Sequence, residues 1–291
     1  MAQGNTTTDA LTDSLPTVIA AARIVREFEG RASQLVDQVT LGVGIGLSWH
    51  EISLAQLTAQ AVTETTVLDN PQQLADTLFT ITPTVSGIHT FFTDRVAARI
   101  SKNAYARTGG LAMNAITRKK DEDCITVLDG ATTSLVGAGS TLATGHISAA
   151  SVRITSNATE PANPPVRCVL HGFQIKDLYD ELTATLGTGE VTEGVTANVF
   201  KSGFKGAIAG AMIYEDGNIT IDGSADAKGG VFAKEAIVKV QGRAVRTETR
   251  REPDIGGGGT SMWIYDEYAY GERSAGNWLF EIYSDATAPT N

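Results

Sequence analysis

The side chains that most often carry chemistry in proteins are scattered through this chain of 291 residues. The four histidines, His50, His89, His146 and His171, have no second histidine or carboxylate at metal-ligand spacing. The G-x-S-x-G pattern of a hydrolase nucleophile and the G-x-x-x-x-G-K-[ST] loop that cradles phosphates are both absent from the sequence. We therefore expect packing or surface roles for the histidines, and we predict no catalytic residue, no bound metal and no cofactor.

Two other stretches come close to known binding motifs and then depart from them. The run from Gly42 to Gly46 has the first glycines of a dinucleotide fingerprint, but the third glycine would stand at Leu47, and no helix is expected to begin there. The acidic stretch from Asp216 to Ser224 resembles a calcium loop, yet its sixth position is Ile221 where glycine is required. Glycines on one face of a strand, and two turns around a short strand at Asn218–Ile221, explain these stretches better.

Composition restricts the class of protein. The chain is 42% hydrophobic and 19% charged, which is too apolar for a disordered protein and too polar for a membrane-spanning one. Its formal net charge of −10 argues against binding that depends on neutralising a phosphate backbone. Cys124 and Cys168 stand without a CxxC partner, as expected for reduced thiols. With no signal peptide in residues 1–13 and no apolar run of about 18 residues, we expect a cytoplasmic place of synthesis and action.

The clearest periodic pattern is an early alternation of apolar residues with glycine, serine and histidine, which predicts a half-buried strand. Its apolar members are Leu41, Val43, Ile45, Leu47 and Trp49. A second alternation at Phe79, Ile81 and Val85 predicts the partner strand of a long hairpin whose tip spans about residues 52–76. An isolated two-stranded ribbon is marginal in water, so something outside the ribbon must cover its apolar face.

The remaining periodicities predict a mixture of helices and strands, with no repeat of 20 to 50 residues. Helices are expected at 14–37 with a break at Gly30, at 87–120 with a kink at Gly109-Gly110, at 147–153 and at 174–186. Strands are expected at 166–170, 232–252 and 262–284, with a flexible glycine run at 256–259. The fold class is therefore α+β.

A charged stretch lies within the expected strand 232–252. Arg246, Glu248, Arg250 and Glu252 alternate in sign and fall on one strand face. Such a face can hold cross-strand or cross-subunit ion pairs. It can equally be a solvated edge strand whose charges protect against aggregation, and both interpretations stay open.

The order of these elements, and several segments in the second half, resemble the major capsid proteins of tailed bacteriophages, which share the Hong Kong 97 fold. The resemblance runs from about Leu15 to Ala286. The segments that carry it are 166–178, a buried strand leading into a helix in which Gly172 replaces the family's usual proline, 203–210, 233–237, 270–271 and 282–286. The resemblance implies a Hong Kong 97-like capsid fold with an N-terminal arm, an extended β-hairpin loop, a long spine helix, a peripheral domain sheet and an α/β apical domain.

The resemblance also implies how the chain is divided. The parts are an N-terminal arm at 1–38, the extended hairpin loop at 39–85, a peripheral domain with the spine helix at 86–129, the apical domain at 130–228, and the C-terminal strands of the peripheral domain at 229–291. The hairpin would then lie over a neighbouring subunit, which supplies the missing cover. The candidate interface residues are Leu41, Val43, Ile45, Leu47, Trp49, Arg246, Glu248, Arg250 and Glu252.

The function implied is a non-enzymatic shell protein that assembles with itself into hexamers and pentamers around double-stranded DNA, without reading the DNA sequence and without a membrane. The expected partners are a separate scaffolding protein, a portal and a decoration protein, with assembly in the host cytoplasm and a final place in the virion. We carry over no lysine–asparagine cross-link, because neither residue can be placed by motif. The alternatives are an encapsulin-like compartment shell and, more remotely, a soluble α+β enzyme.

Overall fold

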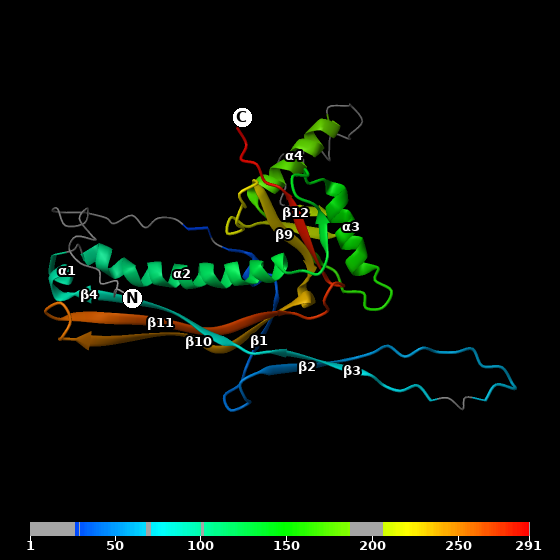
Figure 1. Cartoon of the computed structure of the whole chain (residues 1–291), viewed down its shortest axis with the longest axis horizontal. Coiled ribbons are helices and arrows are strands. Elements are labelled where there is room, and N and C mark those ends of the chain that lie inside the picture. Colours follow the sequence, from blue (N-terminus) through cyan, green and yellow to red (C-terminus); the bar gives the residue numbers. More distant parts are fainter. Residues whose placement is uncertain (1–26, 29, 68–70, 100–101, 187–205, 291) are drawn as a thin grey trace.

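The computed structural model describes residues 27–28, 30–67, 71–99, 102–186 and 206–290. Within these residues the chain folds into three sheets and four α-helices, the α+β arrangement that the sequence predicts (Figure 1). The elements are η2 (Ala32–Gln34), β1 (Asp37–Thr40), β2 (Trp49–Leu54), β3 (Asp76–Ile81), β4 (Thr84–Thr93), α1 (Asp94–Arg99), α2 (Lys102–Asp129), β5 (Ser134–Val136), α3 (Thr144–Thr155), β6 (Val166–Leu170), α4 (Gly172–Leu186), β7 (Ala207–Ile208), β8 (Ala211–Glu215), β9 (Asp226–Ala233), η3 (Lys234–Ala236), β10 (Ile237–Glu252), β11 (Gly259–Glu272) and β12 (Leu279–Asp285).

A four-stranded sheet in the order β1-β10-β11-β4 forms the long part of the molecule, and α2 runs along it (Figure 1). The long strands β10 and β11 are antiparallel, and the turn between them contains the left-handed glycines Gly256, Gly257 and Gly258. The strand predictions at 232–252 and 262–284 and the turn at 256–259 are therefore largely confirmed, with interruptions at η3 and between β11 and β12.

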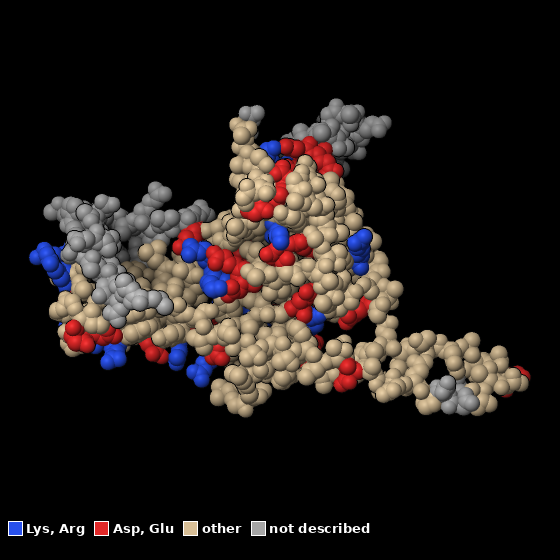
Figure 2. Space-filling model, in the orientation of Figure 1, with Lys and Arg blue, Asp and Glu red and all other residues tan. Residues whose placement is uncertain are grey.

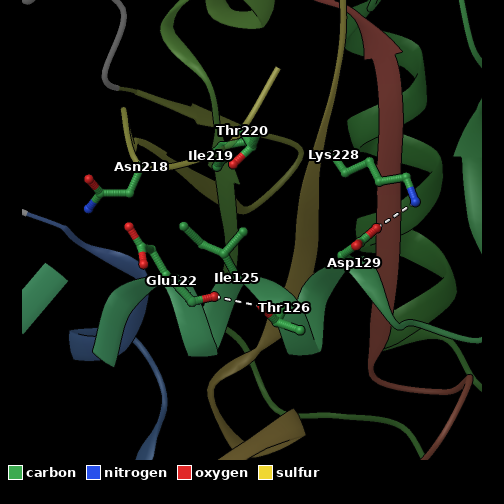
Figure 3. Close-up of a pocket in the computed structure, with 8 residues that line it drawn as sticks. All are labelled: Glu122, Ile125, Thr126, Asp129, Asn218, Ile219, Thr220 and Lys228. Atoms are coloured by element: carbon green, nitrogen blue, oxygen red, sulfur yellow. Dashed lines mark hydrogen bonds and ion pairs between the residues drawn. The ribbon is translucent and has the colours of Figure 1, made fainter. Parts of the chain in front are cut away.

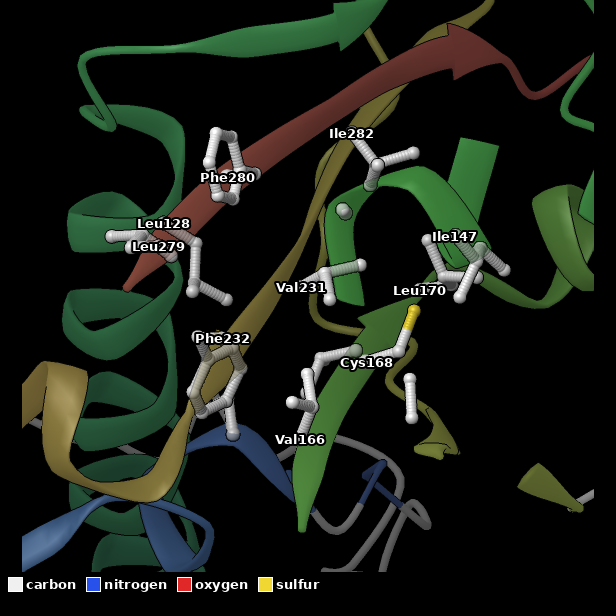
Figure 4. Close-up of a cluster of buried hydrophobic side chains, with 14 of the residues drawn as sticks. Leu128, Ile147, Val166, Cys168, Leu170, Val231, Phe232, Leu279, Phe280 and Ile282 are labelled. Carbon is white, nitrogen blue, oxygen red and sulfur yellow. The ribbon is translucent and has the colours of Figure 1, made fainter. Parts of the chain in front are cut away.

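A six-stranded sheet in the order β5-β12-β9-β6-β8-β7 carries the main hydrophobic core (Figure 4). Its central strands are buried on both faces, and the side chains of Cys168, Leu170, Val231, Phe232 and Ile282 are completely shielded from solvent. The strand predicted at 166–170 and the helices predicted at 147–153 and 174–186 are confirmed by β6, α3 and α4. Runs of apolar residues this dense are typical of strands covered on both sides.

Helix α2 contacts both sheets. The residues that make these contacts are spaced by four or eight positions and lie in one stripe along the helix. Ala112 and Ile116 pack on Ile264 of the four-stranded sheet, whereas Cys124 and Leu128 belong to the core of the six-stranded sheet. Residues four apart lie on one face of a helix, so a single stripe can span both contacts. The helix continues through Gly109 and Gly110 and past Lys120 to Asp129, so the predicted end at residue 120 is wrong.

The first part of the helix predicted at 87–120 is also wrong. Residues up to Thr93 form β4, which pairs with β11, and the first helix begins at Asp94. The apolar residues Ile88 and Phe92 are four apart, and that spacing places residues on one face of a strand as well as of a helix. The spacing alone therefore could not distinguish the two structures.

The helix predicted at 14–37 lies partly outside the described residues, and its described part is not α-helical. Ala32–Gln34 form a single 3-10 turn and β1 begins at Asp37. The backbone N–H groups of Arg31, Ala32 and Ser33 donate to distant carboxylates, so they are not available for a regular helix.

Two smaller differences concern a strand and the thiols. Asn218–Ile221 forms no strand, since its one ladder contact is an isolated bridge between Ile221 and Ala227. Cys124 and Cys168 are free and buried, and burial raises the pKa of both thiols. No helix within the described residues has the length and apolar character needed to cross a membrane.

Candidate subunit-contact surface

A long hairpin projects from the body of the molecule (Figures 1 and 2). Its two strands, β2 and β3, pair antiparallel from Trp49 opposite Ile81 to Leu54 opposite Asp76, and the segment beyond them extends away from both sheets. The predicted hairpin is thus present, but its arms are 49–54 and 76–81 instead of 41–49 and 79–85. Pro83, which cannot donate a ladder hydrogen bond, lies between β3 and β4, and the chain passes there from the hairpin to the four-stranded sheet.

The inner face of the hairpin base packs against the body. Trp49, Phe79 and Ile81 contact Val238 and Val240 of β10. The ring of Trp49 meets the ring of Phe79 edge-on, with centroids 6.1 Å apart. On β11, a Cβ at Gly271 would lie 2.7 Å from Cδ1 of Ile81, so the close approach depends on glycine at that position.

The outer face of the same hairpin is apolar and uncovered. Ile52, Leu54 and Leu78 share this face by their register, and their exposed fractions are 61%, 66% and 61%. Eleven of the sixteen large hydrophobic side chains that are exposed within the described residues lie between Val43 and Val85. Contiguous exposed apolar surface of this kind marks an interaction site in soluble proteins.

The segment 41–48 is a loop, so the strand predicted for Leu41 to Trp49 is wrong. Gly44 and Gly46 have φ angles of +84° and +114°, which break the extended conformation that the alternation predicted. Val43, Ile45 and Leu47 are exposed in this loop. Leu41 and Trp49 at its two ends are instead partly buried against β10.

Arg273, at the end of β11, ties the hairpin base to the body. Its Nε donates to Oε2 of Glu51 (2.8 Å), its Nη1 to the carbonyl of Glu235 (2.9 Å) and its Nη2 to Oδ2 of Asp37 (3.3 Å). Its guanidinium also lies 6.0 Å from the ring centroid of Trp49. Glu51 is separated from Arg273 by more than 200 positions, and no local pattern in the sequence indicated this contact.

The charged stretch of β10 is an edge of the four-stranded sheet. β1 covers β10 only from Val238 to Gln241, and within the described residues no strand pairs with that side of β10 beyond this point. The register with β11 places Arg246, Glu248, Arg250 and Glu252 on one face, as the sequence predicts. An ion pair of 3.3 Å joins Arg246 to Glu248, and the Arg246 guanidinium lies 5.3 Å from the ring centroid of Tyr265.

The far end of this edge is held by a two-point ion pair. Nη1 and Nη2 of Arg251 donate to Oδ1 and Oδ2 of Asp94, at 2.8 and 2.6 Å. The hydrogen bonds from Arg251 hold the pKa of Asp94 below its usual value. This pair joins the start of α1 to the end of β10. Some charged side chains of the edge are thus paired within their own chain, although they are also exposed to solvent.

The described residues also form a shallow pocket between α2 and the turn after β8 (Figure 3). Its volume is about 240 Å³, and the ion pair of Asp129 with Lys228 closes one side of it. The described residues contain no cluster of three or more histidine, cysteine or acidic side chains that could hold a metal ion. The apolar hairpin and the charged edge of β10 are the two candidate surfaces for contact with another macromolecule.

No family model and no curated protein matches this chain by sequence. Solved structures match it over nearly its whole length. They include the acidic stable capsid structure of Helicobacter pylori bacteriophage KHP30 (TM-score 0.73, 11% identity, covering 97% of this chain and 98% of that one). The Cyanophage Pam1 capsid (TM-score 0.72, 10% identity, 99% and 100%) and the capsid of Ralstonia phage GP4 (TM-score 0.68, 12% identity, 99% and 100%) are similar too. The chain therefore has the phage capsid fold, and the predicted Hong Kong 97-like fold class is confirmed.

Proposed function

We propose that this chain is the major capsid protein of a tailed phage, and that its copies assemble as hexamers and pentamers into an icosahedral shell enclosing double-stranded DNA. The observation that carries this proposal is the capsid fold over almost the full length of the chain, combined with a projecting hairpin whose apolar outer face is exposed within the residues that the structure describes. A shell subunit needs such surfaces because stable contacts between copies bury large areas.

The hairpin is the proposed main contact between copies. Ile52, Leu54 and Leu78 on its outer face would lie on a neighbouring copy, together with Val43, Ile45 and Leu47 of the adjoining loop. Covering one such side chain stabilises a contact by about 1.5 to 3 kcal/mol. Leu41 and Trp49 would act indirectly, since they pack at the hairpin base.

Charge supports a partner surface on the edge strand β10. Residues 41–85 contain four acidic residues and no lysine or arginine. Arg246 and Arg250 are exposed on β10, with Glu248 between them and Glu252 after Arg250. In Figure 2 the hairpin carries few charged side chains, and both signs of charge gather along the long sheet. When a hairpin from one copy meets this edge of another, its carboxylates would be favoured opposite Arg246 and Arg250 and disfavoured opposite Glu248 and Glu252, so the alternating signs would set the register of the contact.

The division of the chain follows from this proposal. Residues 1–38 would be the arm, 39–85 the extended loop, 86–129 and 229–291 the peripheral domain, and 130–228 the apical domain. The further partners would be a separate scaffolding protein, a portal and a decoration protein, with assembly in the host cytoplasm before the chain takes its place in the virion. The net charge of −10 suits a wall that must not adhere to the packaged DNA.

Expression of the full chain followed by negative-stain electron microscopy tests the proposal. Hollow polyhedral particles, or rings of six and five copies, are the expected result, with or without a co-expressed scaffolding protein. Small dispersed globules under all conditions, including co-expression with the neighbouring genes of its source genome, would contradict it. Particles that enclose a cellular enzyme in place of DNA would instead indicate an encapsulin-like compartment, an alternative that the capsid structures do not favour.

A further inference from the structure

Two carboxyl groups meet in the interior where three segments of the chain join. Asp121 lies on α2 and Asp216 lies in the turn after β8, and both are completely buried. Each carboxyl group accepts a hydrogen bond from Asn218, which places the two groups next to one another. This arrangement forms within a single chain, and it lies away from the hairpin and the charged edge.

The pair holds the backbone of Gly30–Ser33, here called the entry segment. Oδ2 of Asp216 accepts hydrogen bonds from the backbone N–H of Arg31 (2.8 Å) and of Ala32 (3.2 Å). Oδ1 of Asp121 accepts from the backbone N–H of Ser33 (3.1 Å). A Cβ at Gly30 would lie 2.1 Å from Cγ of Asp121, so the entry segment presses directly on that carboxyl group.

Asn218 donates a hydrogen bond to each of the two carboxyl groups. Its backbone N–H donates to Oδ1 of Asp216 and its Nδ2 donates to Oδ2 of Asp121, both at 3.0 Å. Asn218 also lines the pocket of Figure 3, opposite Glu122 and Ile125 of α2. Every hydrogen bond that the structure gives the pair from outside therefore comes from a neutral N–H group.

The pair lacks a compensating positive charge. Among the described residues, no lysine, arginine or histidine forms an ion pair with either carboxyl group. Burial, followed by the hydrogen bond to Asp216, raises the pKa of Asp121 to about 7. Ionising a buried carboxyl group beside a second carboxyl group, with no cation to compensate, carries a large free-energy cost, so Asp121 keeps its proton to a higher pH than a solvated carboxyl group does.

Other titratable groups surround the pair from each packed element. On α2 the thiol of Cys124 is near Asp121, and on β11 the hydroxyl of Tyr270 is near Asp121 and Cys124. Burial raises the pKa of each of these groups, so both stay neutral at physiological pH. Lys239 of β10 and Asp123 of α2 lie near Cys124, and His171, which precedes α4, lies near Asp216 and Glu215. Burial lowers the pKa of His171, and it is the neighbour whose titration must be separated from that of the pair.

We propose that the buried Asp121–Asp216 pair is a proton-controlled clasp: the proton on Asp121 keeps the entry segment docked between α2 and the turn after β8, and loss of that proton to solvent releases the segment. In the docked state the pair retains a proton that solvated carboxyl groups would have lost, so the docked state binds more protons than the released state. Release is therefore favoured as pH rises. The equilibrium constant for release increases up to tenfold per pH unit between the ordinary carboxyl value of 3.8 and about 7, and is level above that range.

Hydrogen exchange tests the clasp in the full-length chain as purified. Exchange of the amides of Arg31, Ala32 and Ser33 is measured by mass spectrometry from pH 5 to pH 8 and corrected for the intrinsic pH dependence of exchange. We expect protection to fall by at least tenfold between pH 5 and pH 7 and to be constant above pH 7.5. The change Asp121→Asn keeps an oxygen that accepts from Ser33 and removes the titrating proton, while its NH2 group replaces the oxygen that accepts from Asn218. Protection should therefore lose its pH dependence, even if its overall level changes.

Two variants separate the clasp from other causes. Asp254→Asn, in the exposed turn before β11, should leave the pH dependence unchanged. His171→Gln should also leave it unchanged; if it removes the pH dependence while Asp121→Asn does not, His171 is the titrating group and the clasp is wrong. Protection that is constant with pH in the unmodified chain contradicts the proposal outright.

An infrared titration keeps the proposal testable if Asp121→Asn does not fold. The unmodified chain should show a protonated carboxyl band at pH 6 that disappears by pH 8, and absence of such a band contradicts the clasp. Since the clasp requires only the fold of one chain, a failure to assemble into shells would leave this measurement valid, and a constant protection would leave the proposed shell function intact.

Discussion

The six-stranded sheet and the projecting hairpin contain similar apolar side chains and place them in opposite environments. Phe232, Leu170 and Ile282 of the sheet are completely buried by their own chain, whereas Ile52, Leu54 and Leu78 of the hairpin are more than half exposed. The sheet can therefore be stable in a single copy. The hairpin has an apolar face that is exposed in the described part of the chain and that the proposed contact between copies would cover. On this proposal the sheet serves folding and the hairpin serves assembly.

The largest expected effect comes from making the hairpin face polar. The combined change Ile52→Thr, Leu54→Thr and Leu78→Thr should remove about 1.5 to 3 kcal/mol of contact free energy for each side chain, enough to prevent particles from forming. The urea denaturation midpoint of the unassembled chain should not change, because these residues are already exposed. Electron microscopy and denaturation together check both parts.

A matched control is Val152→Thr on α3, another exposed apolar residue, at 52%. Particles should form normally with this change. If the triple variant also forms normal particles, the hairpin face is not a contact between copies and the distinction between the two regions is lost.

The opposite pattern is expected in the core. Phe232→Ala leaves a cavity beneath β9, and the free energy of unfolding should fall by about 3 to 5 kcal/mol in the unassembled chain. Denaturation by urea measures this loss. A loss below about 1 kcal/mol would mean that the sheet, like the hairpin, depends on other copies for its stability.

At the hairpin base we expect a smaller loss of stability than in the core. Arg273→Gln removes the ion pairs with Glu51 and Asp37, and we expect a loss of about 1 to 2 kcal/mol, a modest value because both carboxylates are partly exposed to solvent. Hydrogen exchange of residues 49–54 should speed up while exchange in β6 stays the same. Equal acceleration in both regions would show that the base is not a separate junction.

The smallest effect is expected in the loop that precedes the hairpin. Gly46→Ala places a side chain at a φ of +114° and should cost about 1 kcal/mol, measured by denaturation. Gly223→Ala is the matched control, because its Cβ would meet open space and its backbone is not left-handed. If both changes are neutral, the loop is extended in solution and the strand predicted from the alternation at 41–49 is correct after all.

The sequence predicted the buried region better than the exposed one, for physical reasons. Dense apolar runs such as Val166–Leu170 allow few structures, and β6 and α4 were placed correctly. At Ile88 and Phe92 a four-residue spacing fits a strand and a helix equally well, so the sheet partner β11 decided between them. At Gly44 and Gly46 the conformation depends on positive φ angles that an apolar alternation does not reveal.

The candidate contact surface was predicted only in part. The hairpin and the charged face of β10 were expected, but the outward residues Ile52 and Leu78 were placed in or near the hairpin tip. The alternation Ile52-Ser53-Leu54 was the available signal for them. The Arg273 contact and the Asp121–Asp216 pair join residues far apart in the chain and have no local signal.

Labelling of a thiol on the hairpin tests the central claim, that this apolar face is buried between copies, most directly. In a Leu78→Cys chain the introduced thiol should react with a maleimide before assembly, whereas Cys124 and Cys168 are buried and should not react. Within assembled particles the account predicts that residue 78 is protected from the reagent. Equal labelling of residue 78 in dispersed chains and in particles would contradict it.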